Sequence, residues 1–152
     1  MKAVVLSFLL LIFTATAYGA SEEKAFEEMI AAIDANSISR VKSLLSKGIK
    51  PNLTVDSRAS PTFLTHSAYR GHNDIIRALV TAGADLEAVN GDGYTPLMMA
   101  VFGGRPETVR LLLGYRVNVN AVGARGETPL SLAKESKNSQ VISMLVKAGA
   151  KE

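Results

Sequence analysis

Apolar residues recur at helical spacing through most of the chain, separated by short polar segments rich in glycine and proline. Between residues 22 and 36 they stand three and four positions apart at Ala25, Met29, Ala32 and Ile33, which predicts a helix with one apolar face. A second helix is predicted from about residue 37 to 47, and Gly48 is its C-terminal stop. The later segments show the same pairing of helices, so the pattern favours an all-α protein.

The pattern also repeats with a period of 33 residues. The segment Gly93-Tyr-Thr-Pro-Leu-Met-Met-Ala100 matches the segment from Gly126 to Ala133 at its glycine, its Thr-Pro-Leu and its last alanine. The same step backwards aligns Thr95, Leu97 and Gly104 with three residues of an earlier unit. These residues are Thr62, Leu64 and Gly71. A fixed period of this length indicates a stack of repeated units.

A period of 33 with Thr-Pro-Leu at the start of a helix resembles the ankyrin repeat, whose unit is a turn and two helices. The resemblance implies an all-α repeat solenoid over residues 20–152. We expect a capping repeat at 22–52 and further repeats at about 53–85, 86–118 and 119–152. The first unit lacks Thr-Pro-Leu and carries four glutamates, as suits the end of a stack. They are Glu22, Glu23, Glu27 and Glu28.

Within each unit, specific residues are expected to fix the helix ends and the stacking. Each threonine of the motif is placed to cap its first helix, and a proline after it has no N–H to leave unpaired. Gly83 and Gly149 are expected to end second helices, whereas Arg116 stands at the equivalent position and departs from the pattern. Two rows of apolar residues are expected to stack from unit to unit. They are Leu64, Leu97 and Leu130, and Ile76, Val109 and Ile142.

The N-terminus has the layout of a secretory signal peptide at 1–19. Lys2 precedes an apolar segment that ends at Phe13 and is short for a bilayer span, and small residues follow. Cleavage after Ala17 and cleavage after Gly19 both fit, and an uncleaved membrane anchor is the alternative. The layout predicts export, to the periplasm in a bacterium and otherwise to the outside, with no stable membrane insertion after cleavage. Asn52-Leu-Thr54 matches a glycosylation acceptor in a eukaryote.

Composition and charge narrow the classes of function. The net charge is +3 and the basic residues are scattered, so no electrostatic footprint for nucleic acid is predicted. Cysteine is absent, and the two histidines, His66 and His72, share no helical face, so we predict no metal, no cofactor and no catalytic group. His72 is expected in a turn and His66 in helix packing. Met98 and Met99 suit a core better than a soft metal site.

The resemblance implies that a partner protein binds to the hairpin tips and to the exposed side of the first helices. Tyrosine, arginine and other large side chains dominate such interfaces. Several aromatic residues fall where packing does not demand a ring, Tyr94 among them. The predicted partner-binding residues are Arg58, Tyr69, Arg70, Tyr94, Phe102 and Arg125.

The sequence therefore predicts a monomeric, exported, non-catalytic ankyrin-repeat module that binds another protein. The layout resembles periplasmic ankyrin proteins, some of which are associated with catalase and peroxide resistance, which implies a stress-protection role. Two alternatives use the same surface: an immunity or inhibitor protein that blocks a toxin or enzyme, and a secreted effector scaffold. An enzyme remains a further alternative, although the residues for it are missing.

Overall fold

The computed structural model describes residues 21–55 and 61–151, so the predicted signal peptide and Arg58 lie outside the described residues. Residues 21–34 are helical. Seven further helices follow in chain order: α2 (Ile38–Ser46), α3 (Phe63–Arg70), α4 (Asn73–Thr81), α5 (Pro96–Phe102), α6 (Pro106–Gly114), α7 (Pro129–Glu135) and α8 (Ser139–Lys147). The described ranges contain helices, turns and loops and no strand.

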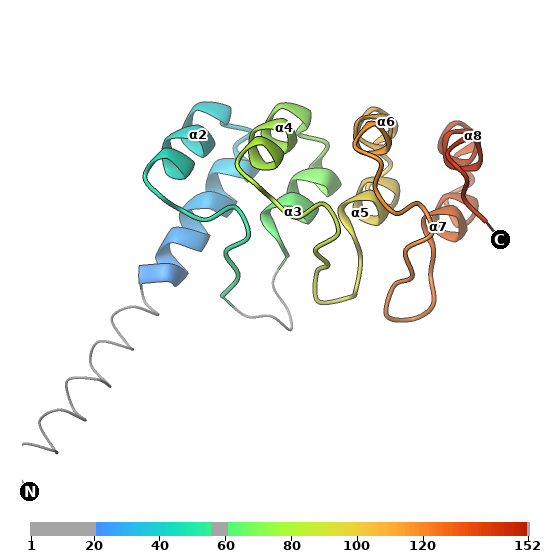
Figure 1. Cartoon of the computed structure of the whole chain (residues 1–152), viewed down its shortest axis with the longest axis horizontal. Coiled ribbons are helices and arrows are strands. Elements are labelled where there is room, and N and C mark those ends of the chain that lie inside the picture. Colours follow the sequence, from blue (N-terminus) through green and yellow to red (C-terminus); the bar gives the residue numbers. More distant parts are fainter. Residues whose placement is uncertain (1–20, 56–60, 152) are drawn as a thin grey trace, which may run out of the picture.

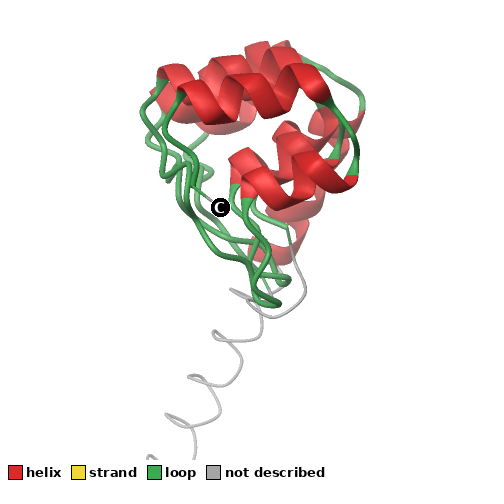
Figure 2. Cartoon of the chain, turned by 90° about the vertical axis from the view of Figure 1, so that its right-hand side faces the viewer, coloured by secondary structure: helices red, strands yellow, loops and turns green. Residues whose placement is uncertain are grey.

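The helices form antiparallel pairs that stack side by side along the long axis of the molecule (Figure 1). The second helices of the pairs, α2, α4, α6 and α8, form one row, and the first helices form another. Helix α3 packs on α5 and α5 packs on α7, so each unit covers the next. The loops between units project together beyond the first helices (Figure 2). The predicted all-α repeat solenoid is confirmed.

The threonine of each Thr-Pro-Leu-like motif caps its first helix as predicted. The Thr62 side chain accepts a hydrogen bond from the Thr65 amide at 3.0 Å, and Thr128 accepts one from the Ser131 amide at 3.1 Å. Thr95 is the equivalent cap of α5 and accepts from the Met98 amide at 3.3 Å. These bonds satisfy amides that the first helical turn leaves unpaired.

The second helices end in left-handed backbone, including where glycine is missing. Gly83 and Gly149 have φ of +92° and +95°, as predicted. Arg116 has φ of +59° at the equivalent position. The turn therefore keeps its left-handed backbone, although a residue with a Cβ atom disfavours that conformation. Asn36 and Lys137 also adopt left-handed backbone, with φ of +48° and +54°. They lie in the turns between the two helices of their units.

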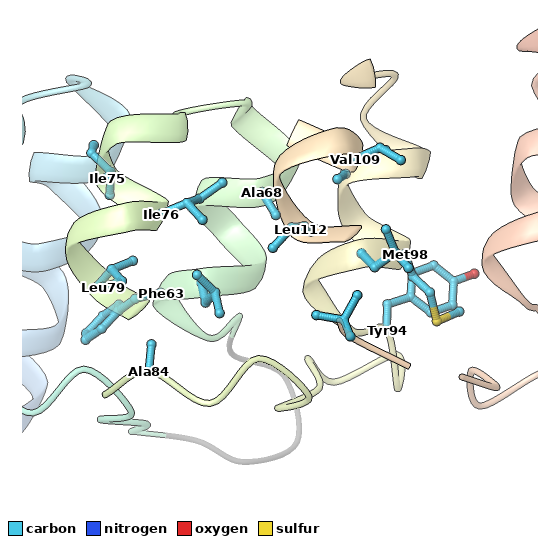
Figure 3. Close-up of a cluster of buried hydrophobic side chains, with 14 of the residues drawn as sticks. Phe63, Ala68, Ile75, Ile76, Leu79, Ala84, Tyr94, Met98, Val109 and Leu112 are labelled. Atoms are coloured by element: carbon cyan, nitrogen blue, oxygen red, sulfur yellow. The ribbon is translucent and has the colours of Figure 1, made fainter. Parts of the chain in front are cut away.

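The core runs through the whole stack as a ladder of equivalent residues, part of which is drawn in Figure 3. Leu64, Leu97 and Leu130 are all at most 3% exposed, and Ile76 and Val109 are fully buried. Ile142, in the last unit described, is only partly buried. The predicted register of both rows is therefore correct.

Side chains in the loops add a second connection between units that the sequence did not reveal. The Asn52 amide nitrogen donates to the Gly83 carbonyl at 3.0 Å, and its oxygen accepts from the Asp85 amide at 2.8 Å. Asn120 makes the equivalent pair of bonds with Gly149 and Lys151. Since the Asn52 nitrogen that would carry a glycan already bonds the next unit, glycosylation there would have to accommodate this contact.

Candidate protein-binding surface

Two aromatic rings stand exposed where the ends of α3 and α5 lie side by side. Phe102 is 60% exposed and Tyr69 is 38% exposed, and their ring centroids are 6.1 Å apart in a stacked arrangement. The two residues are 33 positions apart in the sequence, so the repeat itself places one ring beside the other. We call Tyr69, Phe102 and the neighbouring Tyr94 the aromatic surface. Stacked rings of this kind hold their orientation at low entropic cost, which suits a binding surface.

Tyr94 occupies a different environment from the one predicted. It is only 5% exposed, so the expectation that it stands free at a hairpin tip is wrong. Its ring packs so closely on the next loop that a Cβ on Gly123 would lie 2.8 Å from its Cε1 atom, and Figure 3 shows it beside Met98. Tyr94 still contacts Phe102 edge to face at 6.3 Å between centroids. The buried Tyr94 ring therefore supports the exposed Phe102 ring.

The Tyr94 hydroxyl joins the aromatic surface to charged groups in the next loop. It donates to the Glu127 carboxylate at 2.7 Å and accepts from the Arg125 guanidinium at 3.2 Å, and Arg125 also bonds Glu127 at 2.9 Å. The hydrogen bond to Glu127, with burial added, raises the pKa of Tyr94 above its ordinary value. The same hydrogen bond holds the pKa of Glu127 low. Arg125 is thus held in place while most of its side chain stays exposed.

A second charged cluster lies at the other end of the aromatic surface. Asp34, at the end of the first helix, accepts hydrogen bonds from His66 at 2.8 Å and from Arg70 at 2.6 Å, both to the same oxygen. The His66 hydrogen bond, opposed by partial burial and aided by the charges of His66 and Arg70, lowers the pKa of Asp34 below 3.8. His66 is therefore part of a hydrogen-bonded contact between units, which the prediction of a helix-packing residue did not include.

This cluster predicts a pH dependence that Asp34→Asn removes. Because the folded-state pKa of Asp34 is depressed, its contribution to stability is present above the unfolded pKa and is lost as pH falls through the folded pKa. Urea unfolding of the parent and of Asp34→Asn at about pH 6 and about pH 3 checks this. At the higher pH the parent is expected to be more stable than Asp34→Asn. The difference between their free energies of unfolding should shrink at the lower pH. A difference that is the same at both pH values would contradict the ion-pair assignment.

The structure brings five of the six predicted binding residues together. A line of contacts runs from Tyr69 through Phe102 and Tyr94 to Arg125, across three units, and Arg70 follows Tyr69 in the sequence. The sixth, Arg58, lies outside the described residues. Sequence reasoning missed Asp34 in this line.

Sequence reasoning also missed two exposed valines on successive loops. They are Val89 and Val122, which are 50% and 65% exposed. Their separation of 33 residues was the available signal.

The described residues hold no group of three or more His, Cys, Asp or Glu side chains placed for a metal ion. His72 stands at the N-terminal end of α4, in the turn predicted for it. Burial lowers the pKa of His72, and its Nε2 atom bonds no group in the described part of the chain. No helix within residues 21–55 or 61–151 has the length and apolarity that a membrane span requires.

Comparison with known families agrees with this architecture. A family model described as Ankyrin repeats (3 copies) matches residues 29–123 and 64–152, which together cover most of the chain. No curated protein matches the chain. Proteins of this kind mediate protein–protein interaction and are typically non-catalytic.

Proposed function

The chain belongs to the ankyrin-repeat family, and from this premise we propose that it is an exported module that binds another protein through the aromatic surface. The observation that carries the proposal is Phe102, a large apolar side chain that is 60% exposed and braced by two other rings. A ring that is mostly exposed buries little apolar surface in the free protein, whereas at an interface it supplies much of the binding energy.

The charges around the aromatic surface support the same function. Arg70 and Arg125 lie at its two ends. Arg70 is oriented by Asp34 of the preceding unit, and Arg125 is oriented by Glu127 of its own loop. Arginines fixed in this way lose little conformational entropy when they bind, and they suit the polar rim of an interface. Tyr94 contributes indirectly, since it positions both Phe102 and Arg125.

We further propose that residues 1–19 direct export and are removed, which places the protein in the periplasm of a bacterium or outside a eukaryotic cell. A stress-protection role there and the inhibition of a toxin or enzyme are both compatible with the aromatic surface. N-terminal sequencing of exported protein should find a chain that begins at Tyr18 or Ala20; an intact Met1 would exclude cleavage.

The central test is affinity capture from extracts of the source organism, followed by titration of the recovered partner. Phe102→Ala is expected to weaken binding by about thirtyfold, as truncation of a central interface residue does. The matched control is Val146→Ala on α8, which removes an exposed apolar side chain, 54% exposed, from a second helix.

Thermal melts should show that both variants fold. Equal affinity of the parent and Phe102→Ala would remove the aromatic surface from the binding site. If the partner is an enzyme or toxin, assaying its activity with and without the bound module decides between inhibition and scaffolding.

A further inference from the structure

The row of second helices carries a groove that the aromatic surface does not use. It lies between α2 and α4, has a volume of about 600 Å³, and is open to solvent along one side. Its apolar lining comes from Ile38 and Leu45 on α2, from Ala78 on α4 and from Ala82 at the C-terminal end of α4. We call it the α2–α4 groove. Figure 1 shows these two helices side by side in the row away from the projecting loops.

The groove is open because two residues of α4 are small. The positions 33 residues after Ala78 and Ala82 are Leu111 and Tyr115, on α6 and at its C-terminal end. Both of these larger side chains are partly buried against the core. The chain therefore fills this position in one unit and leaves it hollow in the preceding one, with the fold otherwise unchanged.

The lining of the groove carries more basic than acidic side chains. Lys42 on α2 and Arg77 on α4 line it, with Asp74 as the one carboxylate in the lining. Neither Lys42 nor Arg77 has an ion-pair partner in the part of the chain that the structure describes. From residue 35 to 55 the chain has basic side chains and no acidic one. The basic residues are Arg40, Lys42, Lys47 and Lys50.

We propose that the α2–α4 groove is a second docking site, and that its occupant is an acidic amphipathic helix of a protein partner. A groove between two helices accepts the apolar stripe of a third helix, with bulky side chains spaced at i and i+3 or i+4. Here the space beside Ala78 and Ala82 takes such a side chain. Lys42 and Arg77 pair with carboxylates on the polar edge of the incoming helix.

An anionic membrane is the main alternative occupant, and the shape of the site argues against it. A lipid surface is read by basic side chains spread over a convex or flat face, with apolar residues that project outwards. Here the apolar and the basic side chains line the same hollow, so they do not form an outward-facing surface. A hollow with this lining fits an inserted side chain.

The test uses the mature chain and a fluorescent synthetic peptide of about 14 residues, with leucines at helical spacing and glutamates elsewhere. Fluorescence anisotropy is expected to show binding. The double variant Ala78→Leu, Ala82→Tyr, which copies the residues of the next unit, should weaken it by about tenfold or more. Lys42→Glu with Arg77→Glu should weaken it similarly without filling the space beside Ala78 and Ala82, so the proposal stays testable if the filled variant misfolds.

Three comparisons complete the design. A peptide with lysine in place of every glutamate should bind at least about tenfold more weakly. Phe102→Ala should leave the affinity for the acidic peptide unchanged, which separates this site from the proposed function of the aromatic surface. Vesicles with anionic lipid should not compete. Absence of peptide binding, full affinity of the filled variant, equal binding of the basic peptide, or vesicle binding that displaces the acidic peptide would each overturn the proposal.

Discussion

Replacing Leu97 with alanine is expected to lower the free energy of unfolding by about 2–5 kcal/mol, because it leaves a cavity that the surrounding helices cannot close. Leu97 is 1% exposed at the middle of the row formed with Leu64 and Leu130. Its helix, α5, packs against both α3 and α7, so the cavity opens onto two interfaces between units. In a stack held together only by neighbouring contacts, this weakens cohesion on both sides of one unit.

Urea unfolding of the mature chain, followed by circular dichroism, measures this effect. The matched control is Val122→Ala, which removes an apolar side chain that is 65% exposed in a loop and should change stability by less than about 0.5 kcal/mol. If Leu97→Ala cost less than about half a kcal/mol, the stacking register would be contradicted. A separate early transition in this variant would show that the array splits at α5.

The repeat pattern was sufficient to predict the helices and their stacking, because the helices depend on residues close in sequence and the stacking joins equivalent residues at the fixed period of 33. Thr95 caps the helix that it precedes, and Gly83 adopts the left-handed backbone that its position demands. Even Arg116, where the sequence departs from the pattern, keeps the backbone of the glycines that it replaces. The neighbouring units over-determine the turn, so packing outweighs the local preference of one residue.

The burial of Tyr94 could not be read in the same way, since it depends on a residue 29 positions later. The ring lies where a side chain at position 123 would otherwise be, and Gly123 provides the space. The Tyr94 hydroxyl then forms hydrogen bonds with Glu127 and Arg125, which belong to the same loop as Gly123. A local rule assigns Tyr94 to an exposed loop, whereas the contact between two successive loops decides its position.

The cluster of Asp34, His66 and Arg70 escaped prediction because its bonds join polar side chains of two units, and a repeat pattern does not show which polar side chains pair. The connector before the second unit is two residues longer than later ones, so Asp34 is equivalent to Tyr69 at a separation of 35. One row of the solenoid therefore reads Asp34, Tyr69, Phe102 and Glu135. The two aromatic residues occupy its centre, and Asp34 at one end orients Arg70.

Gly103→Ala is expected to destabilise the protein by about 1–3 kcal/mol and to disturb the aromatic surface at the same time. Gly103 has ordinary right-handed backbone, with φ of −73°, so alanine meets no conformational penalty there. The obstacle is space: an added Cβ would lie 2.5 Å from the Tyr69 carbonyl oxygen and 3.1 Å from its Cδ2 atom. The end of α5 would have to move away from α3, which separates the rings of Phe102 and Tyr69.

Gly114→Ala is the matched control, because a Cβ there meets no atom within 4 Å and the residue closes α6 in helical backbone. It should leave stability unchanged or raise it by up to about 1 kcal/mol, since alanine has fewer unfolded conformations to lose. Urea unfolding of both variants, with titration of the recovered partner, compares them directly. A loss of stability and affinity in Gly103→Ala alone ties the close approach of α3 and α5 to the aromatic surface. Equal behaviour of the two variants would show that the ring pair does not depend on this contact, and that Phe102 reaches its exposed position without support from the helix beside it.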